Sequence, residues 1–204
     1  MEYNGHVKCL QNLITYEESL SLPLRMILMI VTQWILFLVP GILMIMNKEK
    51  ISSLGFRKEK VLLQIGIGLL VAISMSLVFT VFPILLGFKD MVGDRSYTKV
   101  WIFVYEFIYQ ILGVALAEEL IFRGYIYHKL LEIKDNKWFA IIISSIIFGF
   151  FHIFSGNIIQ IIMTTFLGIF FCICREKIKG CTLLSLIIAH GVHNGMIRLW
   201  DSIL

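Results

Sequence analysis

The stretch "WFAIIISSIIFGFFHIFSGNIIQIIMTTFLGIFFCIC", residues 138–174, contains no aspartate, glutamate, lysine or arginine. Residues 26–47 and 61–88 also lack all four of these residue types. A helix needs about 20 apolar residues to cross the hydrocarbon core of a bilayer. Three charge-free runs of this length predict a polytopic membrane protein, because a soluble domain has no need for them.

The composition of the 204-residue chain agrees with this prediction. Hydrophobic residues make up 58% of the chain and charged residues 16%, whereas soluble domains average about 45–50% and about 25%. The run 138–174 is too long for one crossing, and the sequence SGN at 155–157 predicts a turn inside it. We therefore expect one all-α domain, residues 1–204, with about six transmembrane spans: about 24–46, 61–88, 100–128, 138–154, 157–174 and 181–199.

The distribution of lysine and arginine predicts the orientation of these spans. The segments 47–60, 123–137 and 175–180 contain five, four and three of these residues, and the opposite side of the membrane has six. The positive-inside rule therefore places these three loops in the cytoplasm and both termini outside. Because the basic residues follow the topology, the net charge of +4 does not predict a nucleic-acid surface. The expected partner of the spans is the lipid bilayer.

A few ionisable and amide side chains lie within the predicted spans. Such groups are costly inside a bilayer and are therefore candidates for function. At about 1.5 Å of rise per helical residue, the ionisable and amide groups of the third, fourth and sixth spans lie at similar depths in the bilayer. We expect them to meet in one cavity inside the bilayer. The residues are Glu118, Glu119, Arg123, His152, His190, His193 and Asn194.

The spacing of these residues assigns some of them. Glu119 and Arg123 are four residues apart, so we expect an ion pair along one helix face. Glu118 lies about 100° around the helix from Glu119 and has no evident partner on its own helix. A carboxylate without a partner in a low-dielectric medium holds a proton more readily, as a general base near neutral pH must. His190 and Asn194 are also four residues apart and share a face.

Three short motifs in the second half of the chain resemble those of a known family. "EELIFRG" at 118–124, "FGFFH" at 148–152 and "HGVHN" at 190–194 are similar to the EExxxR, FxxxH and HxxxN motifs of the CPBP family. These are intramembrane proteases related to CAAX prenyl endopeptidases and to bacteriocin-processing or self-immunity proteins. The order of the motifs fits over about residues 100–200, which we expect to form the protease core.

The resemblance implies an intramembrane endopeptidase and a role for each motif residue. Glu118 would activate the attacking water, and His152 would help to hold that water. His190 and Asn194 would stabilise the oxyanion of the tetrahedral intermediate. His193 is not part of the motif, and we expect it to face away from Asn194 as a packing or supporting residue. The motif residues that would support the site are Glu119, Arg123 and Phe148.

The resemblance leaves the cofactor open. The family is named as metalloproteases, and Glu118, His152 and His190 could be three ligands of a catalytic zinc ion with an open fourth position. The zinc-binding sequence HExxH is absent from the chain, so a metal-free mechanism in which Glu118 alone deprotonates water is the alternative.

The expected substrate is a peptide or a membrane-associated protein segment, because the short polar loops offer little for recognition outside the membrane. In a bacterial cell membrane, which is the expected location, maturation of a bacteriocin or signalling peptide, or self-immunity, fits better than CAAX processing. Two other functions remain open. One is a non-catalytic immunity or scaffold protein. The other is a proton-coupled transporter, although the sequence has no internal repeat or paired broken helices of the kind transporters use.

Overall fold

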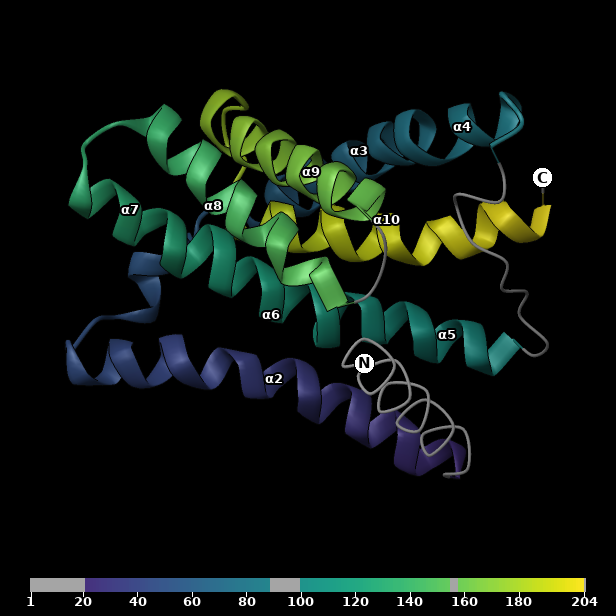
Figure 1. Cartoon of the computed structure of the whole chain (residues 1–204), viewed down its shortest axis with the longest axis horizontal. Coiled ribbons are helices and arrows are strands. Elements are labelled where there is room, and N and C mark those ends of the chain that lie inside the picture. The colour runs from purple at the N-terminus through teal and green to yellow at the C-terminus, as the bar shows by residue number, and fades with distance from the viewer. Residues whose placement is uncertain (1–20, 89–99, 155–157, 204) are drawn as a thin grey trace, which may run out of the picture.

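The computed structural model describes residues 21–88, 100–154 and 158–203. Within these ranges every regular element is a helix, and the long helices run side by side along the longest axis of the molecule (Figure 1). The predicted all-α bundle is therefore confirmed. The predicted turn at 155–157 lies outside the described residues.

The first two spans agree with the predicted ones to within a few residues. α2 covers Leu22–Met46, and a 3₁₀ turn, η1 (Ile51–Leu54), lies in the loop that follows. The second span consists of α3 (Val61–Ser76), the π-helical turn η2 (Leu77–Val81) and α4 (Phe82–Leu85). Their long runs of leucine, isoleucine and valine make both helices apolar around most of their circumference, as a helix in lipid must be.

The third span is longer and less regular than predicted, because it continues to Ile133 and changes its winding twice. A π-helical turn has a wider backbone spacing than an α-helix, and such turns are frequent at functional sites. Glu118 and Glu119 lie in a single α-helical turn between two π-helical segments. The elements are α5 (Val100–Tyr109), η4 (Gln110–Ala115, π), α6 (Leu116–Glu119), η5 (Leu120–Ile126, π) and α7 (Tyr127–Ile133).

The remaining helices are α8 (Lys137–Phe151), the 3₁₀ turn η6 (His152–Phe154), α9 (Ile158–Lys177) and α10 (Leu183–Ile203). The side chain of Asn136 accepts a hydrogen bond from the backbone N–H of Phe139 and so caps the start of α8.

Not all of the helices are long enough to span a membrane by themselves. In the described part of the chain, four segments are long and apolar enough to cross: Met26–Met46, Val61–Leu85, Val100–Ile133 and Ile158–Lys177. The apolar parts of α8 and α10 are shorter. The protein is therefore an integral membrane protein in which α8 and α10 pack as the shorter helices of the bundle.

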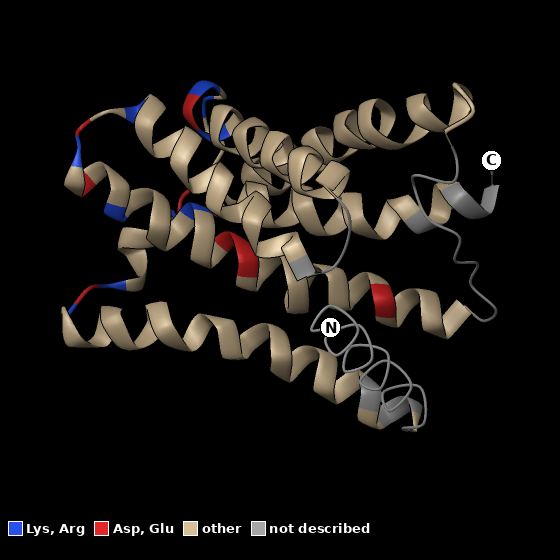
Figure 2. Cartoon of the chain, viewed as in Figure 1, with Lys and Arg blue, Asp and Glu red and all other residues tan. Residues whose placement is uncertain are grey.

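Most of the charged residues lie at one end of the bundle, and acidic residues also occur along the third span (Figure 2). Lys129 forms ion pairs with Glu49, at 2.7 Å, and with Glu132, at 2.8 Å, and Lys137 pairs with Glu176. Arg175 donates a hydrogen bond to the backbone carbonyl of Arg123 in η5. The three basic loops thus lie on the same side of the bundle, as predicted, and their placement in the cytoplasm stays a prediction.

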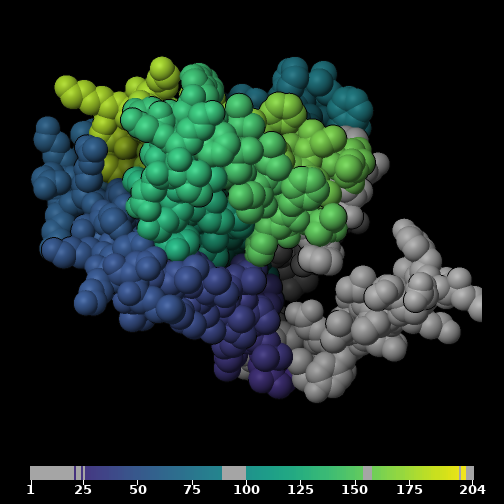
Figure 3. Space-filling view, turned by 60° about the vertical axis from the view of Figure 1, so that its left-hand side comes forward, coloured from purple at the N-terminus to yellow at the C-terminus, as the bar shows by residue number. Residues whose placement is uncertain are grey.

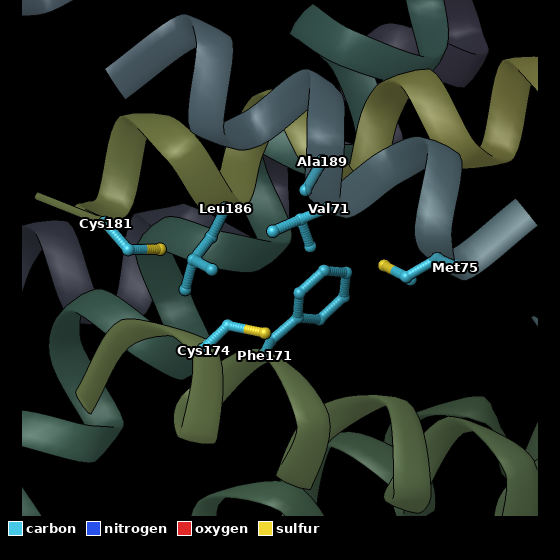
Figure 4. Close-up of a cluster of buried hydrophobic side chains, with 7 residues drawn as sticks. All are labelled: Val71, Met75, Phe171, Cys174, Cys181, Leu186 and Ala189. Atoms are coloured by element: carbon cyan, nitrogen blue, oxygen red, sulfur yellow. The ribbon is translucent and has the colours of Figure 1, made fainter. Parts of the chain in front are cut away.

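The core forms where α3, α9 and α10 meet. α3 packs along α10, and α8 packs along α9. Between the first pair and α9, seven buried side chains form a cluster in which Phe171 is central (Figure 4). The cluster consists of Val71, Met75, Phe171, Cys174, Cys181, Leu186 and Ala189.

α2 lies on the outside of the bundle. It packs against η4, α6 and η5 of the third span, and Figure 3 shows it, in purple and blue, along one side of the molecule. Most of its leucine, isoleucine and valine side chains are exposed, among them Val39 and Ile45. We assign this face to the lipid, since large apolar side chains are stable there without a protein partner.

Candidate functional site

A cavity of about 250 Å³ lies inside the bundle, bordered by α3, the third span, α8 with η6, α9 and α10. Its apolar lining includes Met75, Phe148 and Phe171. The structure brings all four predicted site residues to this cavity, although they come from three segments that are far apart in the sequence. The polar side chains that border it are Glu118, His152, Gln160, Thr164, His190, His193 and Asn194.

Glu119 lies next to the cavity in a dense group of charges. Its Oε1 accepts one hydrogen bond from Arg123 Nη1 and one from His190 Nδ1, both at 2.8 Å. Glu119 is 0% exposed and Arg123 is 1% exposed. The predicted ion pair between Glu119 and Arg123 is therefore confirmed. Sequence reasoning missed the bond to His190, since it joins two helices and helical spacing reveals only neighbours on the same helix.

Aromatic rings surround the guanidinium of Arg123. Its Cζ lies 4.1 Å from the centre of the Phe148 ring and 5.1 Å from that of Phe171. A cation over an aromatic face is attracted by the ring quadrupole, most strongly where water is excluded. Phe148, the first residue of the second motif, thus contacts the ion pair directly. We call Glu119, Arg123 and His190, with these two rings, the ion cluster.

Glu118 is in a different situation. It is only 4% exposed, and none of the described residues donates a hydrogen bond to its Oε2. That atom lies 3.8 Å from His190 Nε2. This separation is too long for a hydrogen bond, so Oε2 and His190 Nε2 face each other without a direct bond. The carboxylate predicted to lack a partner on its own helix therefore faces the cavity and one edge of the His190 ring.

The two imidazoles that flank Glu118 are held by different means. His190 is fixed through its Nδ1 by Glu119, so its Nε2 faces Glu118. His152 is the first residue after α8, and its Nδ1 donates to the backbone carbonyl of Phe148 at 2.9 Å. Its ring also lies edge-on against the Phe148 ring, with centres 4.9 Å apart. Both rings therefore have fixed orientations at the wall of the cavity.

Asn194 is oriented by a residue that the sequence reasoning did not select. Its Nδ2 donates a hydrogen bond to Gln110 Oε1 at 3.2 Å. Gln110 is the first residue of η4, so this bond connects the third span with α10. One N–H of Asn194 is thereby used, and the amide is fixed in one of its two flip states.

His193 is not placed as predicted. It borders the same cavity as Asn194, and its Nδ1 lies 3.1 Å from Ser76 Oγ in α3. The prediction that it faces away from Asn194 is wrong, because positions 190, 193, 194 and 197 of a helix lie on one broad face. Sequence reasoning missed Gln110, Gln160, Thr164 and Ser76, because each is uncharged and lies outside the three motifs.

The proposed zinc ligands were tested against the arrangement of the side chains. In the described ranges, no group of three or more histidine, cysteine, aspartate or glutamate residues is arranged so that it could hold a metal ion. Glu118, His152 and His190 border one cavity, but they do not form such a set. The residues as arranged do not fit a three-ligand zinc site, and the zinc alternative stays a prediction.

The comparison with known families covers the segment that carries this site. Residues 100–196 match the model of the family described as type II CAAX prenyl endopeptidase Rce1-like. This segment, a little under half of the chain, is similar to the Rce1-like family. The resemblance drawn from the three motifs is thereby confirmed, and the Rce1-like segment contains Glu118, His152, His190 and Asn194. No curated protein and no solved structure matches the chain.

Proposed function

We propose that the protein is an intramembrane endopeptidase in which Glu118 activates a water molecule to attack a peptide bond. The observation that carries this proposal is the contrast between two neighbouring carboxylates. Glu119 is engaged by Arg123 and His190, whereas Glu118 borders the cavity with its Oε2 3.8 Å from His190 Nε2. The match of residues 100–196 to a family of endopeptidases supports the reaction class.

The reaction would proceed in two steps. Glu118 accepts a proton from the water as the water oxygen bonds to the carbonyl carbon, which gives a tetrahedral intermediate with a negative oxygen. The intermediate then expels the amine as the C–N bond breaks, and the proton passes from Glu118 to the departing nitrogen. The products are a carboxylic acid and an amine, and Glu118 returns to its starting state. A positioned general base of this kind contributes about 10²–10⁴-fold to a rate.

The other residues would place the water and stabilise the developing charge. His152 would help to hold the water. His190 and Asn194 would donate hydrogen bonds to the oxyanion, with the second N–H of Asn194 available because Gln110 takes the first. As a donor, His190 must carry a proton on Nε2 as well as on Nδ1, and Glu119 would compensate the resulting charge. Arg123 and Phe148 would support Glu119 and the wall of the cavity.

The substrate we propose is a membrane-associated peptide or protein segment. The cavity lies within the bundle, so the scissile bond must enter the protein from the membrane or its surface. The family name makes a CAAX sequence, with its prenylated cysteine, the first peptide to test. Maturation of a bacteriocin or signalling peptide in a bacterial membrane, or self-immunity, is the second. A cleavage assay distinguishes an endopeptidase from three alternatives: a non-catalytic immunity protein, a scaffold and a proton-coupled transporter.

The test uses the purified protein in detergent and two quenched fluorescent peptides. Both end in the same CAAX sequence, and only one carries a farnesyl group on its cysteine. We expect the parent protein to cleave, and Glu118→Gln to lower the rate by about 10²-fold or more. Glu106→Gln, in the same span but away from the cavity, is the matched control and should keep the parent's rate. Cleavage by folded Glu118→Gln at the parent's rate would contradict the mechanism.

The zinc alternative has its own test. Elemental analysis of the purified protein would measure bound zinc, and a chelator would be added during the cleavage assay. If the mechanism needs no metal, the protein keeps its full cleavage rate after chelation and contains no stoichiometric zinc. Loss of activity on chelation, together with about one zinc per chain, would establish the metal mechanism instead.

A further inference from the structure

The lining of the cavity contains a second buried histidine besides His190. His193 is 2% exposed and borders the cavity, together with Asn194 on the same helix. Its Nδ1 lies 3.1 Å from Ser76 Oγ, and Ser76 is itself 1% exposed. Ser76 lies in α3, outside the segment that matches the Rce1-like family. This contact therefore links the first part of the chain to the site.

The contact with Ser76 fixes the tautomer of the His193 ring. The hydroxyl of Ser76 has two possible acceptors here, Nδ1 of His193 at 3.1 Å and the sulfur of Met196 at 3.8 Å. An imidazole nitrogen is a good acceptor and a thioether sulfur a weak one, so the hydroxyl donates to Nδ1. A neutral imidazole that accepts at Nδ1 carries its proton on Nε2. In this tautomer Nε2–H is the N–H donor of the ring.

The position of His193 suits a contact with the substrate backbone. His190, His193 and Asn194 lie on one face of α10, at positions i, i+3 and i+4, and all three border the cavity. A peptide that places its scissile bond beside Glu118 and His190 therefore passes along this face. A neutral N–H on a wall that is otherwise lined by groups such as Met75 and Ile197 is suited to a carbonyl oxygen.

We propose that His193 is a further substrate-contacting residue, which donates its Nε2–H to a backbone carbonyl oxygen of the bound peptide, and that Ser76 is the positioning residue that sets its tautomer. This inference rests on the proposed endopeptidase function and adds a binding contact to it. It also gives α3 a part in the site.

The test measures binding of the fluorescent farnesylated CAAX peptide to the full-length Glu118→Gln protein by fluorescence anisotropy. Two substitutions separate a substrate contact from a structural role. In His193→Gln the amide reaches the position of Nε2 and keeps a donor toward the cavity, but it loses the bond to Ser76. In His193→Asn the shorter amide keeps an acceptor near Ser76 and loses the donor toward the cavity. We expect the Asn variant to bind about tenfold more weakly, and the Gln variant to bind within about threefold of the parent.

Serine substitutions on α3 provide the matched control. Ser76→Ala removes the hydroxyl that sets the tautomer and should weaken binding by about two- to tenfold. Ser74→Ala removes a hydroxyl that bonds only to the backbone carbonyl of Leu70 at an exposed position, so it should leave binding unchanged. Losses that are equal in the two His193 variants, or reversed in order, would overturn the inference. Failure of the proposed function is seen separately, as peptide cleavage by Glu118→Gln itself, or as no binding and no cleavage by the parent.

Discussion

Glu118 and Glu119 are neighbours in the sequence, but their side chains belong to two different regions of the molecule. Glu119 lies in the ion cluster, where Arg123 and His190 both donate to one of its oxygens. Glu118 lies at the cavity, where its Oε2 is 3.8 Å from His190 Nε2. One residue step turns a helix by about 100°, and here this turn separates a carboxylate with strong partners from a buried one at the edge of the cavity.

The two carboxylates show that a charge can be kept within a membrane protein for two different reasons. In the ion cluster, the desolvation cost of the charges is offset by their mutual hydrogen bonds and by the aromatic rings over Arg123. Glu119 and Arg123 are thereby engaged with each other, whereas His190, held by Glu119, also borders the cavity. The carboxylate at the cavity lacks this compensation, and so it destabilises the fold unless its function requires it.

The largest predicted effect on stability is in the ion cluster. Arg123→Ala leaves the carboxylate of Glu119 buried without its strongest partner, and loss of one member of a buried ion pair costs about 3–5 kcal/mol. Thermal unfolding in detergent, followed by tryptophan fluorescence, measures the change. The control is Lys129→Ala at the exposed end of the bundle, which should cost less than about 1 kcal/mol. Equal effects in the two variants would remove the distinction between the cluster and the surface pairs.

The next largest effect concerns the packing that forms the wall of the cavity. A Cβ at Gly191 would lie 2.6 Å from the backbone Cα of Ile111, so Gly191→Ala must push α10 away from η4. We expect a loss of about 1–3 kcal/mol and lower activity, because Gln110 and Asn194 separate. At Gly66 a Cβ meets nothing within 4 Å, and Gly66→Ala should be neutral or stabilise by about 0.4–1 kcal/mol. Parental stability and activity in Gly191→Ala would show that this contact is not tight.

A smaller effect concerns the orientation of the Asn194 amide, which can be measured separately from the stability of the fold. Gln110→Met keeps the length of the side chain but removes the acceptor for Asn194, so the amide can rotate. One hydrogen bond is worth about 0.5–1.5 kcal/mol, which corresponds to a fall in cleavage rate of up to about tenfold. Thermal unfolding of the same samples should change by no more than this amount. An unchanged cleavage rate would show that the bond does not orient Asn194 for catalysis.

The sequence was sufficient for the features that depend on composition and on spacing within one helix. The charge-free runs located the spans, and the spacing of Glu119 and Arg123 predicted their ion pair. Contacts between distant segments could not be obtained in this way. The bond from His190 to Glu119 joins residues 71 positions apart, and that from Ser76 to His193 joins residues 117 positions apart.

The sequence also did not predict the helical winding of the third span. The π-helical segments η4 and η5 change the angular phase of the residues on either side of α6. A constant 3.6-residue period therefore does not describe which side chains of this span share a face. For this reason the partnership of Gln110 with Asn194 emerged only from the structure, although the ion pair from Glu119 to Arg123 could be predicted locally.

The most direct test of the account measures peptide cleavage and thermal unfolding on the same preparations of Glu118→Gln and Glu119→Gln. We predict that Glu118→Gln loses cleavage by about 10²-fold or more while its unfolding temperature stays the same or rises, because an uncompensated buried carboxylate is removed. Glu119→Gln should have a clearly lower unfolding temperature, because Arg123 then keeps a buried charge without its counter-ion. Parental cleavage by Glu118→Gln, or parental stability of Glu119→Gln, would contradict the division between the two regions.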